Sequence, residues 1–234
     1  LIACEALLRW NHPERGLQPP PEFIPVAEQS QLIVPIGDWV LREACRHLHQ
    51  WRSEGLDVVR VAVNVSLIQL ALGDFPQRVR ACLDEFDVAP SALTLEITES
   101  VFERESLKLL RQLQQLQRMG IRLSLDDFGT GYSSLVYLQK YPFDEIKVDR
   151  AFVSQVLDDA YSREVVSSVL GLASAIGAEV VAEGIESDAV RDELIELGCR
   201  MGQGYYFSMP LEAEDFRWLL QQRTSLPLSV AASG

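Results

Sequence analysis

The sequence has few of the residues that hold soft metals or form disulfides. Its 234 residues include 4 cysteines and 3 histidines. His47 and His49 are two apart on an expected helix, so they point away from each other and are expected at the surface. The cysteines form no CxxC pair, which favours reduced, buried thiols over zinc ligands or disulfides; they are Cys4, Cys45, Cys82 and Cys199.

Basic residues are also scarce. Lysine and arginine together number 21, against 34 aspartates and glutamates, so the net charge of −13 argues against non-specific binding to nucleic acid or to an anionic membrane. No apolar run reaches the roughly 18 residues that a membrane helix needs, and the start does not resemble a signal peptide. We expect a soluble, cytoplasmic segment without direct membrane contact, although the full-length protein could carry an anchor elsewhere.

No Pro/Gly/Ser-rich linker, low-complexity run or fixed-period repeat divides the chain. The length suits one large domain, which we place at residues 1–222; two small domains are a less favoured alternative. Residues 223–234 lose helical periodicity and are expected to form a tail or linker.

Hydrophobic periodicity predicts an alternation of helices and short apolar strands. Several helices stop at a glycine, namely Gly55, Gly120, Gly177 and Gly198. The helices are expected near residues 22–30, 36–54, 75–86, 105–119, 162–176, 189–197 and 213–221. The strand candidates are VRVAVNVS, ALTLEIT, IRLSLDD, FDEIKVD, AEVVAEG and a short run around 204–207.

This alternation predicts a mostly parallel sheet covered by helices. About seven strands in one domain favour a closed (β/α) barrel, and an open doubly wound sheet is the runner-up. Gly129, Gly131 and Ser134 do not make the GxGxxG pattern of a dinucleotide site.

Two adjacent carboxylates, Asp126 and Asp127, end the apolar strand in LSLDDFGTGYSS. Strand alternation sends them in different directions, so they could serve two metal ions, while Gly129 and Gly131 let the backbone bend beside them. An Asp-rich turn that caps the next helix is the alternative reading.

Other strands also end in polar residues, and barrel enzymes place their active sites at these strand ends. A lone acid there is more often a cap or a solvated residue, but joint recurrence favours a site. Oxygen donors without histidine or cysteine suit hard cations such as Mg²⁺ or Mn²⁺. The residues are Glu5, Asn64, Glu96, Asp126, Asp127, Lys147, Glu183 and Gln203.

The chain resembles the EAL-domain phosphodiesterases that hydrolyse cyclic di-GMP. The motifs that carry the resemblance span nearly the whole chain in order: EAL at 5–7, NVS at 64–66, EITES at 96–100, DDFGTGYSSL at 126–135, IKVD at 146–149, AEGIE at 182–186 and QGYYF at 203–207. The resemblance implies a TIM-like barrel with one antiparallel strand, two Mg²⁺ or Mn²⁺ ions at its mouth, and linear pGpG as the product.

The resemblance also implies roles for individual residues. Lys147 and Glu183 would orient or deprotonate the attacking water, and Asp126 would bridge the two ions. The implied metal ligands are Glu5, Asn64, Glu96, Asp126, Asp127 and Glu183. The implied substrate contacts are Leu7, Arg9, Asp149, Glu186 and Gln203.

A regulatory loop is implied as well, in which Glu99 anchors the segment that begins Phe128, Gly129, Thr130 and Gly131 and couples the metals to a homodimer. From the residues alone, Glu99 reads as an acid at a helix N-terminus. Family members carry about 25 to 30 residues before the tripeptide, including the first barrel strand, which is apparently missing here; an upstream sensory or GGDEF-type domain is also expected.

Three functions remain open. The favoured one is a metal-dependent phosphodiesterase. The second is a receptor that binds cyclic di-GMP with little or no turnover, and the third is a protein scaffold without nucleotide. Relatives without activity usually lose a ligand or the lysine, and this chain retains them all.

Overall fold

The structure is a computed structural model that describes residues 3–56, 60–72, 74–104, 106–129, 138, 140–141 and 143–225. Within these residues, no helix combines the length and the apolar character needed to cross a membrane.

Seven strands form one parallel sheet, in the order β1-β4-β5-β6-β7-β8-β9. All seven therefore end on the same side of the sheet, which is the arrangement of a TIM-like α/β fold. The antiparallel strand that the resemblance implies is not among them. The strands are β1 (Ala3–Ala6), β4 (Arg60–Asn64), β5 (Leu93–Thr98), β6 (Arg122–Phe128), β7 (Glu145–Val148), β8 (Glu179–Ala182) and β9 (Met201–Gly202).

The sheet curls so that its two edges approach each other at the carboxyl ends of the strands. Gln203, just after β9, donates a hydrogen bond of 2.8 Å from Nε2 to Oε2 of Glu5 in β1. A small antiparallel hairpin, which the sequence analysis did not predict, follows β1; its strands are β2 (Trp10–His12) and β3 (Gly16–Gln18).

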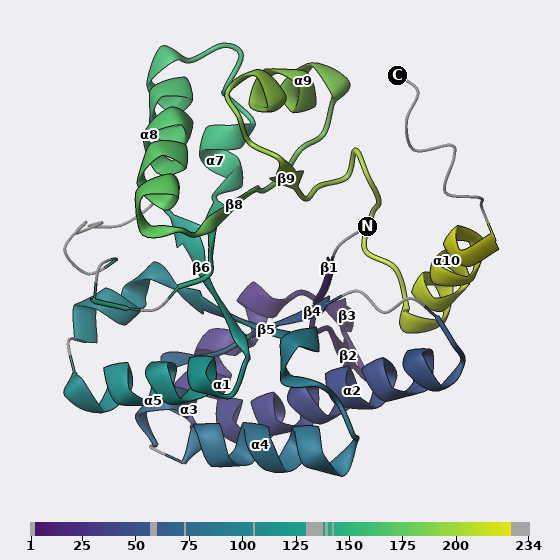
Figure 1. Cartoon of the computed structure of the whole chain (residues 1–234). Helices are drawn as coiled ribbons and strands as arrows, with labels where there is room; N and C mark the ends of the chain where they lie inside the picture. The colour runs from purple at the N-terminus through teal and green to yellow at the C-terminus, as the bar shows by residue number, and fades with distance from the viewer. Residues whose placement is uncertain are drawn as a thin grey trace.

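Helices connect the strands, and each of the seven predicted helices is present. Figure 1 shows α7, α8 and α9 gathered on one side of the strands, and α2, α4 and α5 on the other. The helices are α1 (Ile24–Gln29), α2 (Ile33–Ser53), α3 (Leu67–Ala71), α4 (Phe75–Glu85), α5 (Leu107–Arg118), α7 (Arg150–Val153), α8 (Ala160–Ile176), α9 (Asp188–Glu196) and α10 (Ala213–Ser225). The short helices α3 and α7 were not predicted.

The predicted glycine stops are confirmed. Gly55, Gly120, Gly177 and Gly198 follow α2, α5, α8 and α9, and all four have positive φ angles, from 71° to 96°. Glycine adopts this left-handed conformation without the steric cost that a side chain adds, so it ends a helix and releases the chain toward the next strand.

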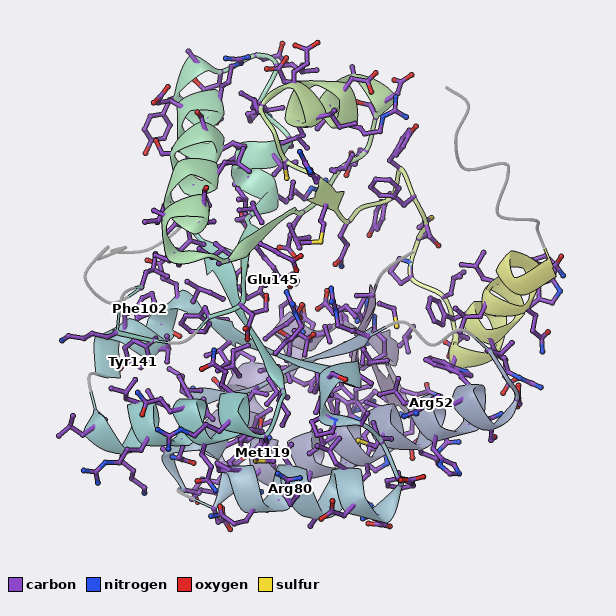
Figure 2. All side chains as sticks on the ribbon, in the orientation of Figure 1. Arg52, Arg80, Phe102, Met119, Tyr141 and Glu145 are labelled. Atoms are coloured by element: carbon purple, nitrogen blue, oxygen red, sulfur yellow. The ribbon has the colours of Figure 1, made fainter. Side chains whose placement is uncertain are left out.

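Alternate side chains of the central strands point either into the apolar core or into a second, polar interior. Leu95 and Ile97 of β5 are fully buried in the hydrophobic core, while Glu96 between them is buried among polar groups. Side chains fill the space between sheet and helices (Figure 2), and Phe102 packs against Tyr141 there with 5.6 Å between ring centroids. The core is therefore apolar on the helix side of the strands.

The cysteines and histidines lie as expected, apart from small differences in exposure. Cys45, Cys82 and Cys199 are buried, Cys4 is half-buried, and all four are free thiols. His49 is exposed, whereas His47 is half-buried beside Trp51. Three of the four thiols are therefore buried as predicted, and Cys4 is not fully buried.

Candidate functional site

Four carboxylates surround a buried lysine at the carboxyl ends of the strands. The Nζ atom of Lys147 in β7 lies 2.7 Å from Oε1 of Glu183 and 2.9 Å from Oε1 of Glu96. It also lies 3.4 Å from Oδ1 of Asp126 and 3.5 Å from Oε2 of Glu5. Lys147 is only 2% exposed, so these contacts form out of bulk water, where unpaired charge would be costly.

Two amide side chains orient Glu5. The Nδ2 atom of Asn64, at the end of β4, donates to Oε1 of Glu5 over 2.7 Å, and Gln203 donates to the other oxygen. Each carboxylate oxygen of Glu5 thus has an amide donor, and Lys147 approaches one of them. The structure brings together Glu5, Asn64 and Gln203 from three different strand ends, as the sequence predicts.

The paired aspartates depart from simple strand geometry. The register of β6 against β7 shifts between Leu125 and Phe128, and Asp127 has a φ of 57°, in the left-handed region. This backbone interrupts the alternation that was expected to send the two side chains in different directions. One oxygen each from Asp126, Asp127 and Glu183 lie within 4.8 Å of one another, an arrangement that could hold a metal ion.

The charges at the site shift one another's pKa values. Burial would lower the pKa of Lys147, but Glu96, Glu5 and the other carboxylates outweigh it and raise that pKa, so the ammonium stays charged. Burial also opposes ionisation of Glu5, yet Lys147 and the amide donors hold the pKa of Glu5 below its usual value.

The pKa values of three other acids, Glu96, Glu183 and Asp127, are shifted upward. Burial raises the pKa of Glu96 well above its usual value, despite the attraction of Lys147. Burial likewise raises the pKa of Glu183 to about 7, and burial together with Asp126 raises the pKa of Asp127. Acids whose pKa values are pushed apart in one cleft are typical of functional sites, where one group takes up a proton and another stays charged.

The donor set fits hard divalent cations. Its ligand atoms are carboxylate and amide oxygens, which Mg²⁺ and Mn²⁺ prefer, and they come from strand ends that face one another. Asp126, Asp127 and Glu183 form the compact group, while Glu5, Asn64 and Glu96 reach it through their contacts around Lys147. Six of the predicted metal ligands therefore belong to one connected cluster.

The predicted substrate contacts are spread more widely. Leu7 is 41% exposed, and Arg9 is also exposed, with Nη1 donating to the carbonyl of Leu8 at 2.8 Å. Asp149 accepts a hydrogen bond of 2.7 Å from the backbone of Ala151 and so caps α7. Glu186 is exposed at the rim.

The start of the predicted loop is hydrogen-bonded to an acid that directly follows the neighbouring strand β5. Glu99, 6% exposed, accepts a hydrogen bond of 3.2 Å at Oε2 from the backbone N–H of Gly129. Phe128 is buried. Thr130 and Gly131, which belong to the same predicted loop, lie outside the described residues.

The sequence analysis missed two groups near the site. Arg150 in α7 forms an ion pair with Glu186, with Nη2 2.7 Å from Oε1. Ser66, two residues after Asn64, closes a capping box with Gln69 and donates to Glu28 Oε1 at 2.6 Å. The S-x-x-Q spacing is a recognised helix start and could have revealed the second group.

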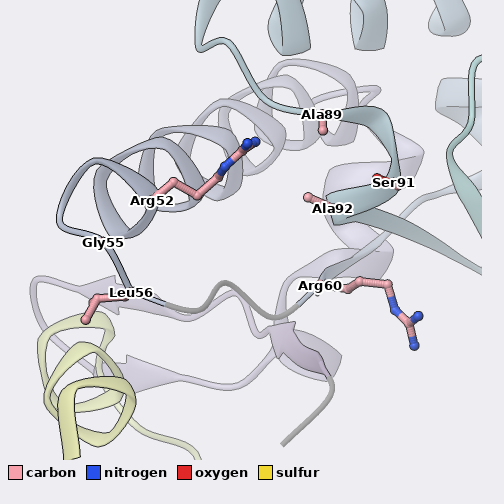
Figure 3. Close-up of a pocket in the computed structure, with 7 residues that line it drawn as sticks. All are labelled: Arg52, Gly55, Leu56, Arg60, Ala89, Ser91 and Ala92. Carbon is pink, nitrogen blue, oxygen red and sulfur yellow. The ribbon is translucent and has the colours of Figure 1, made fainter. Parts of the chain in front are cut away.

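A separate hollow lies away from these residues. It has a volume of about 460 Å³ and is lined by residues at the amino ends of β4 and β5, the opposite ends of those strands from the acids (Figure 3). Parallel-barrel enzymes do not use that end for chemistry, so we place the candidate site at the acidic cluster. Its lining residues are Arg52, Gly55, Leu56, Arg60, Ala89, Ser91 and Ala92.

Comparison with known proteins shows relatives among bacterial signalling proteins. The bifunctional diguanylate cyclase/cyclic di-GMP phosphodiesterase MucR of Pseudomonas aeruginosa is 43% identical over 214 residues, which cover 92% of this chain and 31% of MucR. The chain spans between 25% and 31% of the length of three such curated relatives.

Solved structures are similar throughout the fold. A structure of the PaMucR phosphodiesterase in complex with c-di-GMP has a TM-score of 0.86 and 43% identity, covering 91% of this chain and 86% of that one. The EAL enzyme Bd1971, bound to cAMP and cyclic di-GMP, has a TM-score of 0.88 and 38% identity, covering 93% and 60% of the two chains. The family model of the EAL domain matches residues 1–210, and the chain belongs to the EAL domain family.

Proposed function

We propose that this chain hydrolyses cyclic di-GMP to linear pGpG. The observation that carries the proposal is the convergence of Lys147 on four acids from four strand ends, in a member of a family whose relatives include cyclic di-GMP phosphodiesterases. In this reaction a water oxygen bonds to phosphorus, one P–O bond of a 3′,5′ bridge breaks, and the departing oxygen receives a proton.

Two Mg²⁺ or Mn²⁺ ions are the proposed cofactors. Glu5, Asn64, Glu96 and Asp126 would hold the first ion, and Asp126 would also contact the second, together with Asp127 and Glu183. When bound, such ions acidify water and stabilise charge on the phosphoryl oxygens. The compact group of Asp126, Asp127 and Glu183 supports this assignment.

The pKa values separate the roles of Lys147 and Glu183. Lys147 remains an ammonium, because the surrounding acids raise its pKa, so it can orient the water and stabilise negative charge. Burial raises the pKa of Glu183 to about 7 in the site without metal ions, which makes it the most suitable proton acceptor beside Lys147. We therefore assign Glu183 as the acceptor of the water's proton and Lys147 as its charged partner.

The remaining predicted residues would contact the nucleotide. Gln203 reaches the rim of the cluster through Glu5, and Glu186 lies on the turn after Glu183. Arg9 carries a cation that could pair with a phosphate, while Leu7 directly follows β1 and Asp149 directly follows β7. These five assignments, to Leu7, Arg9, Asp149, Glu186 and Gln203, complete the proposed substrate site.

The negative charge of the site should make substrate binding dependent on metal ions. Four acids surround the ammonium of Lys147, and Asp127 lies beside two of them, so the cluster would repel a dianionic substrate unless divalent cations reverse the local field. Substrate binding in productive geometry should therefore depend on the metal as well as on the nucleotide contacts.

The domain is proposed to work within a longer protein. The length of the relatives supports an additional sensory or GGDEF-type domain, with the phosphodiesterase unit at residues 1–222. We further propose a homodimer in which the segment that starts at Phe128 and Gly129, held by Glu99, responds to the partner. Light scattering after gel filtration measures the oligomeric state.

The experiment that tests the function is incubation with cyclic di-GMP and Mg²⁺ or Mn²⁺, followed by chromatography for pGpG. The account expects pGpG with either ion and none with excess chelator. Tight nucleotide binding without any product would instead favour a receptor. Product formation by fully chelated protein would remove the metals from the mechanism.

A further inference from the structure

The short helix α7 lies between the two turns that follow the candidate metal ligands. It begins one residue after β7, and its N-cap is Asp149. One of these turns contains Gly129, two residues after Asp127, and the other contains Gly184, directly after Glu183. Side chains of α7 press against both glycines.

Phe152 contacts the first turn. A Cβ atom placed on Gly129 would lie 2.9 Å from Cε2 of Phe152, closer than real Cβ contacts come, with Cζ and Cδ2 of the ring at 3.5 and 3.6 Å. Gly129 has a φ of +103°, and its N–H is held by Glu99. The Phe152 ring therefore packs directly against the backbone of Gly129, two residues after Asp127.

Arg150 contacts the second turn through its aliphatic stem. A Cβ atom on Gly184 would lie 2.3 Å from Cγ, 2.7 Å from Cβ and 2.8 Å from Cδ of Arg150. The guanidinium continues past the glycine to Glu186, while the N–H of Glu183 donates to the carbonyl of Val148 at 3.0 Å. Val148 thus holds the turn before Gly184, and Arg150 holds it at Gly184 and beyond.

We propose that α7 sets the separation between the Asp126–Asp127 pair and Glu183, with Phe152 and Arg150 as positioning residues. This inference rests on the proposed metal-dependent function. Three carboxylates within 4.8 Å repel one another, so their geometry needs external support. Support of this kind typically changes metal affinity by about 10- to 100-fold when it is removed.

The stem of Arg150, rather than its charge, carries this role. The ion pair with Glu186 is half-exposed, with 61% and 50% of the two side chains accessible, and exposed pairs contribute little. Arg150→Met keeps an unbranched stem without charge, whereas Arg150→Ala removes it. We expect Arg150→Met to bind Mn²⁺ almost as tightly as the wild type and Arg150→Ala to bind it about tenfold more weakly.

Pairs of glycines with similar φ angles distinguish the effect of the contact with α7 from the effect of backbone strain. Gly184 and Gly177 have φ angles of +71° and +76°, but an added Cβ at Gly177 meets nothing within 4 Å. Gly129 and Gly198 form a second pair, at +103° and +96°, and Gly198 is likewise open. Alanine at all four positions adds similar left-handed strain, and only alanine at Gly184 or Gly129 pushes against α7.

The experiment measures Mn²⁺ affinity by the electron paramagnetic resonance signal of free Mn²⁺, without nucleotide, and unfolding of each chelated variant in urea. We expect Gly184→Ala and Gly129→Ala to lose about tenfold or more in affinity per folded molecule. Gly177→Ala and Gly198→Ala should keep the wild-type affinity even though their unfolding midpoints fall.

A compensating second substitution distinguishes a clash with α7 from a general loss of folding. Phe152→Ala removes the ring atoms that an alanine at position 129 would strike, so the double variant should bind Mn²⁺ more tightly than Gly129→Ala alone. Equal affinities in the glycine variants and their controls, or no effect of Phe152→Ala and Arg150→Ala, would overturn the role of α7. Absence of turnover in wild-type protein with these affinity differences intact would instead refute the proposed function only.

Discussion

The ammonium of Lys147 in β7 lies 2.7 Å from a carboxylate oxygen of Glu183, which directly follows the neighbouring strand β8 and is 36 positions later in the sequence. This contact joins the two groups to which the chemistry is assigned. Because burial and neighbouring acids shift the pKa values of both, their protonation states depend on each other, and changes at either residue should alter the site as a unit.

Removal of the lysine should abolish most turnover. Lys147→Ala is expected to lower kcat by about 10²- to 10³-fold, the range for loss of a group that stabilises developing charge, while substantial nucleotide binding remains. Steady-state kinetics gives kcat, and calorimetry gives nucleotide affinity. Lys108→Ala is the matched control, because Lys108 is exposed and its ammonium donates to the carbonyl of Ala71, away from the acidic cluster. A near-normal rate for Lys147→Ala would take this residue out of the mechanism.

Neutralising Glu5 should weaken metal binding without a large loss of volume. Glu5→Gln keeps the size of the side chain but removes the charge that Asn64, Gln203 and Lys147 surround, so metal affinity should fall by about tenfold or more. Calorimetric titration with Mn²⁺ measures the change. Glu85→Gln provides a control for the loss of one negative charge, because Glu85 pairs with Arg42 on the exposed surfaces of α4 and α2. Equal affinities for both variants would contradict the assignment of Glu5.

Metal binding should depend on pH through Glu183. Its pKa is raised to about 7, so below that pH the side chain holds a proton that a divalent ion must displace. The apparent metal affinity should therefore rise as the pH increases toward 7 and level off above it, with a slope of about tenfold per pH unit for one displaced proton. Titrations in buffers of different ionisation enthalpy count the protons released. Glu183→Gln should weaken the pH dependence near pH 7, and an unchanged dependence would assign the proton to another acid such as Glu96, whose pKa burial also raises.

The capping box after Asn64 should contribute to folding stability. Ser66→Ala removes the hydroxyl that accepts from Ile68 N–H and donates to Glu28, so the free energy of unfolding should fall by about 1 kcal/mol. Urea denaturation measures the effect. Ser53→Ala, which removes an exposed hydroxyl bonded within its own helix, should change stability by less than about 0.5 kcal/mol. A larger loss for Ser53→Ala than for Ser66→Ala would show that this cap is not a stabilising feature.

Much of the fold could be predicted because its signals are local and long. The seven predicted helices repeat apolar residues over several turns, and glycines such as Gly177 mark their ends. The helices α3 and α7 have five and four residues, too few for a periodic pattern to emerge. The hairpin of β2 and β3 has three residues in each strand, and the same reason explains why it was missed.

The membership of the site could also be predicted, but its internal geometry could not. Because Glu5, Glu96 and Lys147 lie near the carboxyl ends of parallel strands, the sequence predicts that they lie together, although it does not predict their contacts. The left-handed backbone of Asp127 depends on a register shift against β7, a long-range feature that strand alternation does not contain. Arg150 was missed for a related reason, since its contact exists only because Gly184 brings the turn after β8 against α7.

The central claim is metal-dependent attack of water on the phosphodiester. The most direct measurement is mass spectrometry of the product formed from cyclic di-GMP in ¹⁸O-labelled water, with Mg²⁺ or Mn²⁺ and with excess chelator. The account predicts pGpG that carries one ¹⁸O atom on its new terminal phosphate, and only when metal is present. Unchanged cyclic di-GMP in the metal-containing sample, or labelled pGpG in the chelated one, would contradict it.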